Sequence, residues 1–120
     1  MEYNVPIKVL IDGVQVKFDQ PPVIQDGRTL VPLRAIFEAM DATVTWDAET
    51  RTVTSIKIDT TIVLKIGNNV MTKNGSDITL DVPAQILNGR TLVPARAVAE
   101  SFGAKVDWDA KTRTVIITQE

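Results

Sequence analysis

The sequence contains an internal repeat, and this repeat limits the folds available to a chain of 120 residues. Residues 13–53 align without a gap with residues 75–115, at an offset of 62 (75 minus 13), and about half of the aligned positions are identical. We therefore predict a single domain, residues 1–120, made of two repeats at about residues 12–55 and 74–117. A β-hairpin segment is expected to join them.

Each repeat shows the same order of local signals. The dipeptides Asp12-Gly13 and Asn74-Gly75 favour two-residue hairpin turns, because both positions of such turns need positive φ. Proline occupies residues 32 and 94, where its fixed φ and missing N–H suit the start of a helix, so we expect helices to begin there. Apolar residues then recur at helical spacing in both copies: Leu33, Ile36, Phe37 and Met40; Ala95, Val98, Ala99 and Phe102.

After each helix, an alternating segment ending at Trp46 or Trp108 predicts a strand with one buried face. A return strand follows each of them. In the first copy the apolar phase changes between Val53 and Ile56, which predicts a β-bulge close to Ser55.

The fold class predicted from this order is α+β, two-layer: a helix, a five-stranded antiparallel meander and a helix, with a further β-hairpin at each terminus and an internal two-fold sequence repeat. We expect antiparallel pairing throughout, because every connection is short. The hairpin of residues 5–18 is expected to pair with that of residues 104–118, so that a pseudo-twofold axis relates two half-sheets.

Composition excludes several functions. The net charge of −2 argues against a nucleic-acid partner. No apolar run reaches the roughly 20 residues of a membrane span. This sequence shows no charged-then-apolar pattern of a signal peptide before the first expected strand, and we expect such a signal, if the protein has one, to lie outside it. With no Cys and no His, carboxylates are the only remaining candidates for metal binding or general base catalysis, and we expect no cofactor.

Arginine is retained across the repeat, whereas lysine is not. All six arginines form matched pairs, namely Arg28/Arg90, Arg34/Arg96 and Arg51/Arg113, and none of the seven lysines has a lysine counterpart. This retention indicates that the planar guanidinium is used, either to staple loops and helices to the sheet or to grip an acidic ligand. Candidate partners are Glu38 and Glu100 on the helices, and Asp47 and Asp109 across the hairpin turns.

The only two tryptophans, Trp46 and Trp108, are also matched. Each continues an alternating apolar face, so we expect both indoles to pack in the core. The alternative is a sugar-binding platform, because each indole lies beside a carboxylate.

Two acidic arrangements give little support to catalysis or calcium binding. Asp107 and Asp109 resemble the start of a calcium loop, but the glycine and distal glutamate of such a loop do not follow. Glu38 and Glu100 are expected to face away from the apolar stripes on separate helices, which does not suit a paired-carboxylate hydrolase. We expect the protein not to be an enzyme.

The segments GRTLVPLRAIFEAM, ATVTWDAETRTV and LDVPAQILNGRTLVPARAVAESFGAKVDWDAKTRTV resemble the copper amine oxidase N-terminal-like domain family, also called the stalk domain. The resemblance covers nearly the whole chain and implies a helix, a five-stranded antiparallel meander and a helix. Catalysis by copper amine oxidases needs three His ligands and a quinone formed from a Tyr that lies between Asn and Asp or Glu. This chain has no His, and its one Tyr, Tyr3, lies between Glu2 and Asn4. No catalytic or copper-binding residue carries over.

What the resemblance implies is a non-catalytic accessory module of secreted or cell-surface proteins of Gram-positive bacteria. We expect a spacer, an assembly element or a protein-interaction domain, and as the alternative a carbohydrate- or cell-wall-binding module. The expected partners are a protein or a cell-wall polysaccharide, and a homo-oligomer or strand-swapped dimer stays open. The expected location is extracellular or at the cell surface.

Overall fold

The structure, a computed structural model, describes residues 7–119 and contains three β-sheets and two helices. The terminal sheet has the strand order β12 (Lys105–Asp109), β13 (Thr114–Thr118), β1 (Lys8–Ile11), β2 (Val14–Gln15). The central sheet has the order β10 (Gln85–Leu87), β11 (Arg90–Pro94), β4 (Arg28–Pro32), β3 (Val23–Gln25). The five-stranded sheet has the order β5 (Thr43–Asp47), β6 (Thr52–Lys57), β7 (Thr60–Lys65), β8 (Val70–Lys73), β9 (Ser76–Thr79).

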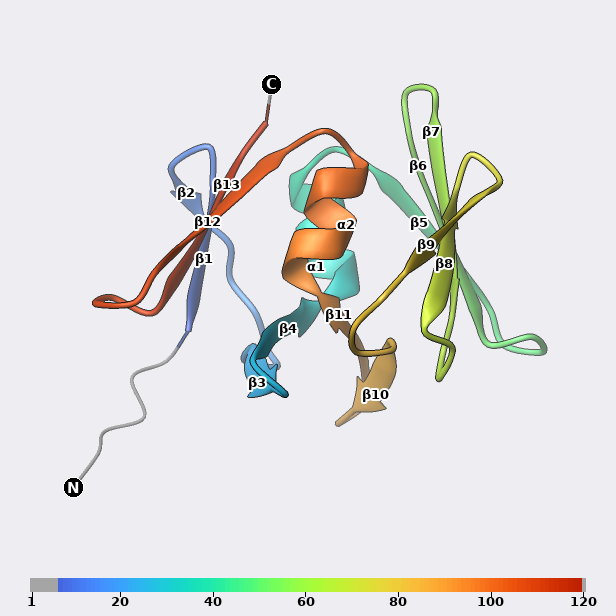
Figure 1. Ribbon diagram of the computed structural model, residues 1–120, viewed down its shortest axis with the longest axis horizontal. Coiled ribbons are helices and arrows are strands. Elements are labelled where there is room, and N and C mark those ends of the chain that lie inside the picture. Colours follow the sequence, from blue (N-terminus) through green and yellow to red (C-terminus); the bar gives the residue numbers. More distant parts are fainter. Residues whose placement is uncertain (1–6, 120) are drawn as a thin grey trace.

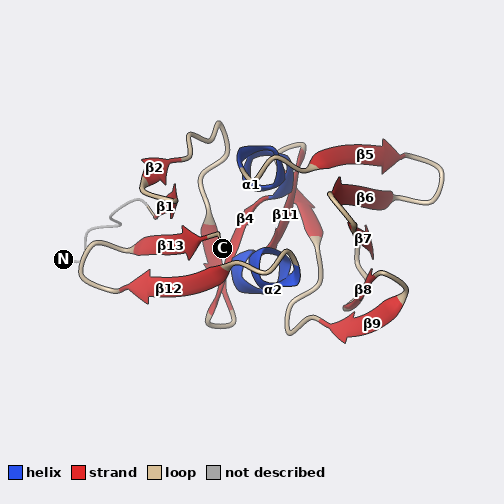
Figure 2. Ribbon diagram, turned by 90° about the horizontal axis from the view of Figure 1, so that it is seen from above, coloured by secondary structure: helices blue, strands red, loops and turns tan. Residues whose placement is uncertain are grey.

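Helices α1 (Leu33–Ala39) and α2 (Ala95–Ser101) lie side by side between the terminal sheet and the five-stranded sheet (Figure 1). The view from above shows the same arrangement, with β4 and β11 leading into the two helices (Figure 2). The α+β class is confirmed. The expected two layers are wrong, because two sheets bury their inner faces against one pair of helices and the helices become a middle layer.

Equivalent positions of the two repeats contact each other, which indicates a pseudo-twofold relation between them. Strands β4 and β11 are antiparallel, and Val31 is paired with Val93, its own counterpart 62 residues later. Far from this pair in sequence, Lys57 donates a hydrogen bond to Gln119, which is again its counterpart. Contacts between equivalent positions arise where a two-fold axis passes between them.

The pairing of the two terminal hairpins holds for the described residues, since β1 pairs with β13, although residues 5 and 6 lie outside the described range. Its expected antiparallel direction is wrong, because β1 and β13 run parallel. In the five-stranded sheet, β7 separates β6 from β8, so β6 and β8 are also parallel. Val9 pairs directly with Val115 and Ile11 with Ile117 in the terminal sheet, whereas the equivalent positions of β8 and β6 are joined through a residue of β7.

Both helices begin one residue later than expected, because Pro32 and Pro94 keep extended ψ angles of 119° and 121° and end the preceding strands. The apolar stripes face the core as predicted. Phe37 packs edge-on against Phe102 with ring centroids 5.2 Å apart. The repeat counterpart of Phe37 is Ala99 and that of Phe102 is Met40, so the two helices differ most in side-chain size at the Phe37/Ala99 position.

The β-bulge expected close to Ser55 does not form. β6 keeps one register with β5 and another with β7 along its whole length, without an extra residue. Ser55 takes the buried position and donates a hydrogen bond from Oγ to the Thr43 carbonyl at 2.8 Å. Because the register does not change, the isoleucines that follow Ser55 are exposed: Ile56 faces outward, and Ile58 is 91% exposed at the β6–β7 turn.

Candidate functional site

Two ion pairs join a loop of one repeat to a strand of the other. Arg28, at the start of β4, contacts Asp81, with 2.7 Å between Nη2 and Oδ2. Its two-fold equivalent joins Arg90, at the start of β11, to Asp19, with the Arg90 Nε 3.1 Å from both carboxylate oxygens. Asp19 and Asp81 are themselves 62 residues apart, so their retention in both copies was a signal that the sequence analysis missed.

These pairs are exposed to solvent, with about half of each arginine and about two thirds of each aspartate side chain accessible. The hydrogen bond from Arg90 is the main cause that lowers the pKa of the Asp19 carboxyl from its ordinary value of 3.8. The same contact raises the pKa of Arg90. Solvent screens exposed pairs of this kind and they stabilise the fold little, so they define the surface more than they hold the fold together.

The helix arginines pair with the glutamates expected from the sequence. Arg34 Nη1 lies 3.2 Å from Glu38 Oε2, and Arg96 Nη1 lies 3.2 Å from Glu100 Oε2. Arg96 also donates to the Val106 carbonyl of β12 at 3.0 Å, which ties α2 to an edge strand. The side chains of Arg34 and Arg96 are each more than half exposed to solvent.

The hairpin carboxylates have a local role. Asp47 Oδ1 accepts backbone N–H bonds from Glu49 and Thr50, and Asp109 Oδ1 accepts them from Lys111 and Thr112. This is the turn geometry expected from the sequence. Arg51 and Arg113 follow these turns with positive φ, 54° and 52°.

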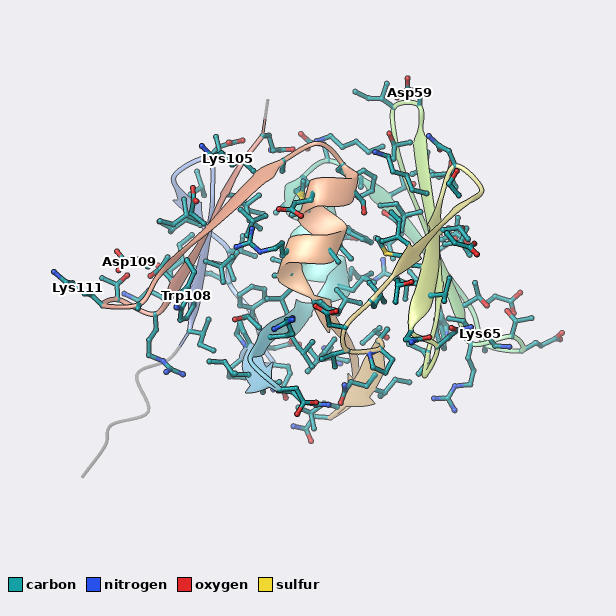
Figure 3. The ribbon with its side chains drawn as sticks, in the orientation of Figure 1. Asp59, Lys65, Lys105, Trp108, Asp109 and Lys111 are labelled. Atoms are coloured by element: carbon teal, nitrogen blue, oxygen red, sulfur yellow. The ribbon has the colours of Figure 1, made fainter. Side chains whose placement is uncertain are left out.

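The expectation that both indoles pack in the core is wrong. Trp46 is 43% exposed and Trp108 is 40% exposed, and neither belongs to the core cluster. The predicted face is correct, since Trp46 lies opposite buried Val53 and Trp108 lies opposite buried Val115. The rings are only partly buried because β5 and β12 are edge strands, so no further strand covers the outer side of either ring. Figure 3 shows Trp108 close to Asp109 at the turn end of β12.

The two indoles line two surface grooves that are equivalent under the pseudo-twofold axis. The first groove has a volume of about 920 Å³ and contains Trp108, and the second has a volume of about 690 Å³ and contains Trp46. Every residue that lines the second groove has its repeat counterpart in the first, and no residue lines both.

Each groove is lined by one helix ion pair and by one loop ion pair. The first groove brings together Arg96, Glu100, Arg28 and Asp81; the second brings together Arg34, Glu38, Arg90 and Asp19. An exposed isoleucine, Ile24 or Ile86, adds apolar surface. Of the sequence-predicted residues, Trp46, Trp108, Arg28, Arg34, Arg90 and Arg96 therefore gather in the grooves, whereas Arg51, Arg113, Asp47 and Asp109 do not line them.

Among residues 7–119, no group of three or more acidic side chains is placed to hold a metal ion. The whole chain lacks His and Cys. Within the described range, no helix has the length and apolar character needed to cross a membrane.

This fold is a small α+β module with two equivalent surface grooves. The sequence profile of the copper amine oxidase N-terminal domain matches residues 10–117. The chain therefore belongs to this family, which fits a non-catalytic accessory module. No curated protein matches the chain significantly.

Proposed function

We propose that the chain is a non-catalytic accessory module of the bacterial cell surface that binds a cell-wall polymer through its two grooves. One observation carries this proposal: the two tryptophans are half exposed in equivalent grooves, although each lies on the inner face of its sheet. A large apolar ring costs free energy when it stays in water, and a module that acted only as a spacer would gain by burying it.

The experiment is a pull-down on purified cell-wall polysaccharide. We expect the unmodified chain to sediment with the polymer and the Trp46→Ala/Trp108→Ala double variant to stay in the supernatant. Circular dichroism of the double variant checks that it is folded. A spacer without affinity for the wall would leave the unmodified chain in the supernatant, which would contradict the proposal.

A second candidate is a protein-interaction or assembly role, favoured by the turn between β6 and β7. Ile58 is 91% exposed and has a φ of 54°, which is strained for a β-branched residue. An apolar side chain held in that position suits a partner protein. Under this candidate, Ile58→Gly keeps the turn and removes the contact, so it weakens capture of a partner without changing binding to the polysaccharide.

A further inference from the structure

We propose that the two grooves are separate binding sites for a neutral oligosaccharide, so that one chain holds two ligands. This inference rests on the proposed function and adds the class of ligand and the stoichiometry. Three features of the grooves support it: their charge balance, their chemistry and their separation.

Charge is balanced within each groove. The first groove has three basic and three acidic side chains: Arg28, Lys73 and Arg96; Asp81, Glu100 and Asp107. The second has two of each: Arg34 and Arg90; Asp19 and Glu38. Because the formal charge of each groove is zero, neither groove favours an acidic or a basic ligand by net attraction.

The chemistry of the lining suits a sugar. Each indole provides a flat apolar face, and the arginines and carboxylates at the walls provide donors and acceptors side by side. A sugar ring presents both an apolar face of C–H groups and a rim of hydroxyls, each of which donates and accepts. The volumes of about 920 and 690 Å³ lie in the range of roughly 300–1,000 Å³ that is typical of small-molecule sites.

The sites are separate and unequal. They share no lining residue, so a ligand in one groove has no direct contact with the other. The first groove is larger, and it is lined by six residues whose repeat counterparts do not line the second: Lys73, Ile78, Thr79, Leu80, Ser101 and Asp107. We therefore expect the first groove to accept the longer oligomer.

Isothermal titration with a neutral N-acetylglucosamine oligomer tests the inference on the unmodified chain. We expect two ligands per chain, one for each groove, and little change in affinity between low and high salt. Trp46→Ala and Trp108→Ala should each leave one site and weaken the other at least about tenfold, which corresponds to roughly 1.4 kcal/mol. Trp46→Phe and Trp108→Phe keep an aromatic face and serve as matched controls that retain two sites.

Failure of this inference differs from failure of the proposed function. Sedimentation with the wall polymer, combined with no heat from the neutral oligomer or with binding that needs acidic sugars and falls steeply with salt, would overturn the inference alone. A single site that survives both tryptophan substitutions would also overturn it. Absence of both sedimentation and heat would overturn the inference and the proposed function together.

Discussion

Arg34 and Arg96 occupy equivalent positions, but one hydrogen bond distinguishes their surroundings. Both pair with a glutamate four residues later, and only Arg96 is shown to donate also to a strand carbonyl, that of Val106. The staple role considered for the retained arginines therefore applies more strongly to Arg96 than to Arg34. The exposed pairs alone contribute little, because solvent screens them and the long side chains lose entropy when they are held.

Lysine substitutions separate these contributions. We expect Arg96→Lys to lower the free energy of unfolding by about 0.5–1.5 kcal/mol, the usual net value of one hydrogen bond. Arg34→Lys serves as the matched control, with a loss below about 0.5 kcal/mol. Urea denaturation measures both values. Equal losses in the two variants would show that the hydrogen bond from Arg96 to Val106 does not stabilise the fold.

Asp12 links the β1–β2 turn to the end of the chain. Its carboxylate accepts bonds from the Gln119 backbone N–H at 2.9 Å and from Gln119 Nε2 at 2.8 Å. The backbone bond is the main cause that lowers the folded-state pKa of Asp12 below 3.8. The carboxylate therefore stabilises the folded chain above about pH 3.8, and this contribution disappears as the pH falls through the lower, folded-state pKa.

The variant Asp12→Asn tests this link without straining the turn, because Asn74 occupies the equivalent position with the same positive φ. We expect the variant to be less stable than the unmodified chain at pH 7 and the difference to vanish at pH values well below 3.8. Urea denaturation over this pH range gives the comparison. A difference that stays constant with pH would mean that the charge of Asp12 is not involved.

At the scale of elements, the helix ends show where two copies of one pattern have diverged. Gly103 follows α2 with a φ of 83°, while Asp41 holds the equivalent position after α1 with a φ of 64°. The left-handed conformation costs a residue with a Cβ roughly 1–2 kcal/mol, although Asp tolerates it better than most. A Cβ at Gly103 would meet no atom within 4 Å, so backbone conformation alone decides the cost there.

Substitutions at these two positions should change stability in opposite directions. We expect Asp41→Gly to raise the free energy of unfolding by up to about 1 kcal/mol and Gly103→Ala to lower it by about 1 kcal/mol. Thermal denaturation of the two variants measures both effects. Destabilisation by Asp41→Gly would indicate that the Asp41 side chain, rather than its φ, matters at this helix end.

Local chemistry predicted the turns, the helix stripes and the α+β class, because these features depend on neighbouring residues. Strands β4 and β11 were missed, although Asp26-Gly27 and Asn88-Gly89 stand between segments that pair as hairpins. The alternating pattern also identified the face on which Trp46 and Trp108 lie, but not how far each side chain is buried. The extent of burial depends on which strands become edge strands, and the order of strands in a sheet is set by contacts between distant parts of the chain.

At the scale of the whole molecule, the two repeats depend on each other. β4 pairs with β11, β1 pairs with β13, and the loop ion pairs run from one repeat to the other. β1 and β13 are the repeat counterparts of β8 and β6, which run parallel to each other on either side of β7 in the five-stranded sheet. The parallel direction of β1 and β13 is therefore the same as that of their counterparts. The assignment of residues 1–120 to a single domain stays a prediction.

Cutting the chain between Gly67 and Asn68 tests this dependence. We expect neither fragment to unfold cooperatively alone, because each loses its partner in the central sheet. Mixing equal amounts should restore the cooperative transition, which circular dichroism follows during heating. A cooperative transition in either isolated fragment would contradict the account of a shared interior.

Under the proposed function, the retained indoles are surfaces for a ligand rather than parts of the core. Nuclear magnetic resonance of the two indole N–H groups tests it most directly during titration with cell-wall oligosaccharides. The account predicts that both indole signals shift, each with its own dependence on ligand concentration, while the amide signals of Val31 and Val93 stay in place. Indole signals that remain unchanged while the oligosaccharide binds elsewhere would contradict it.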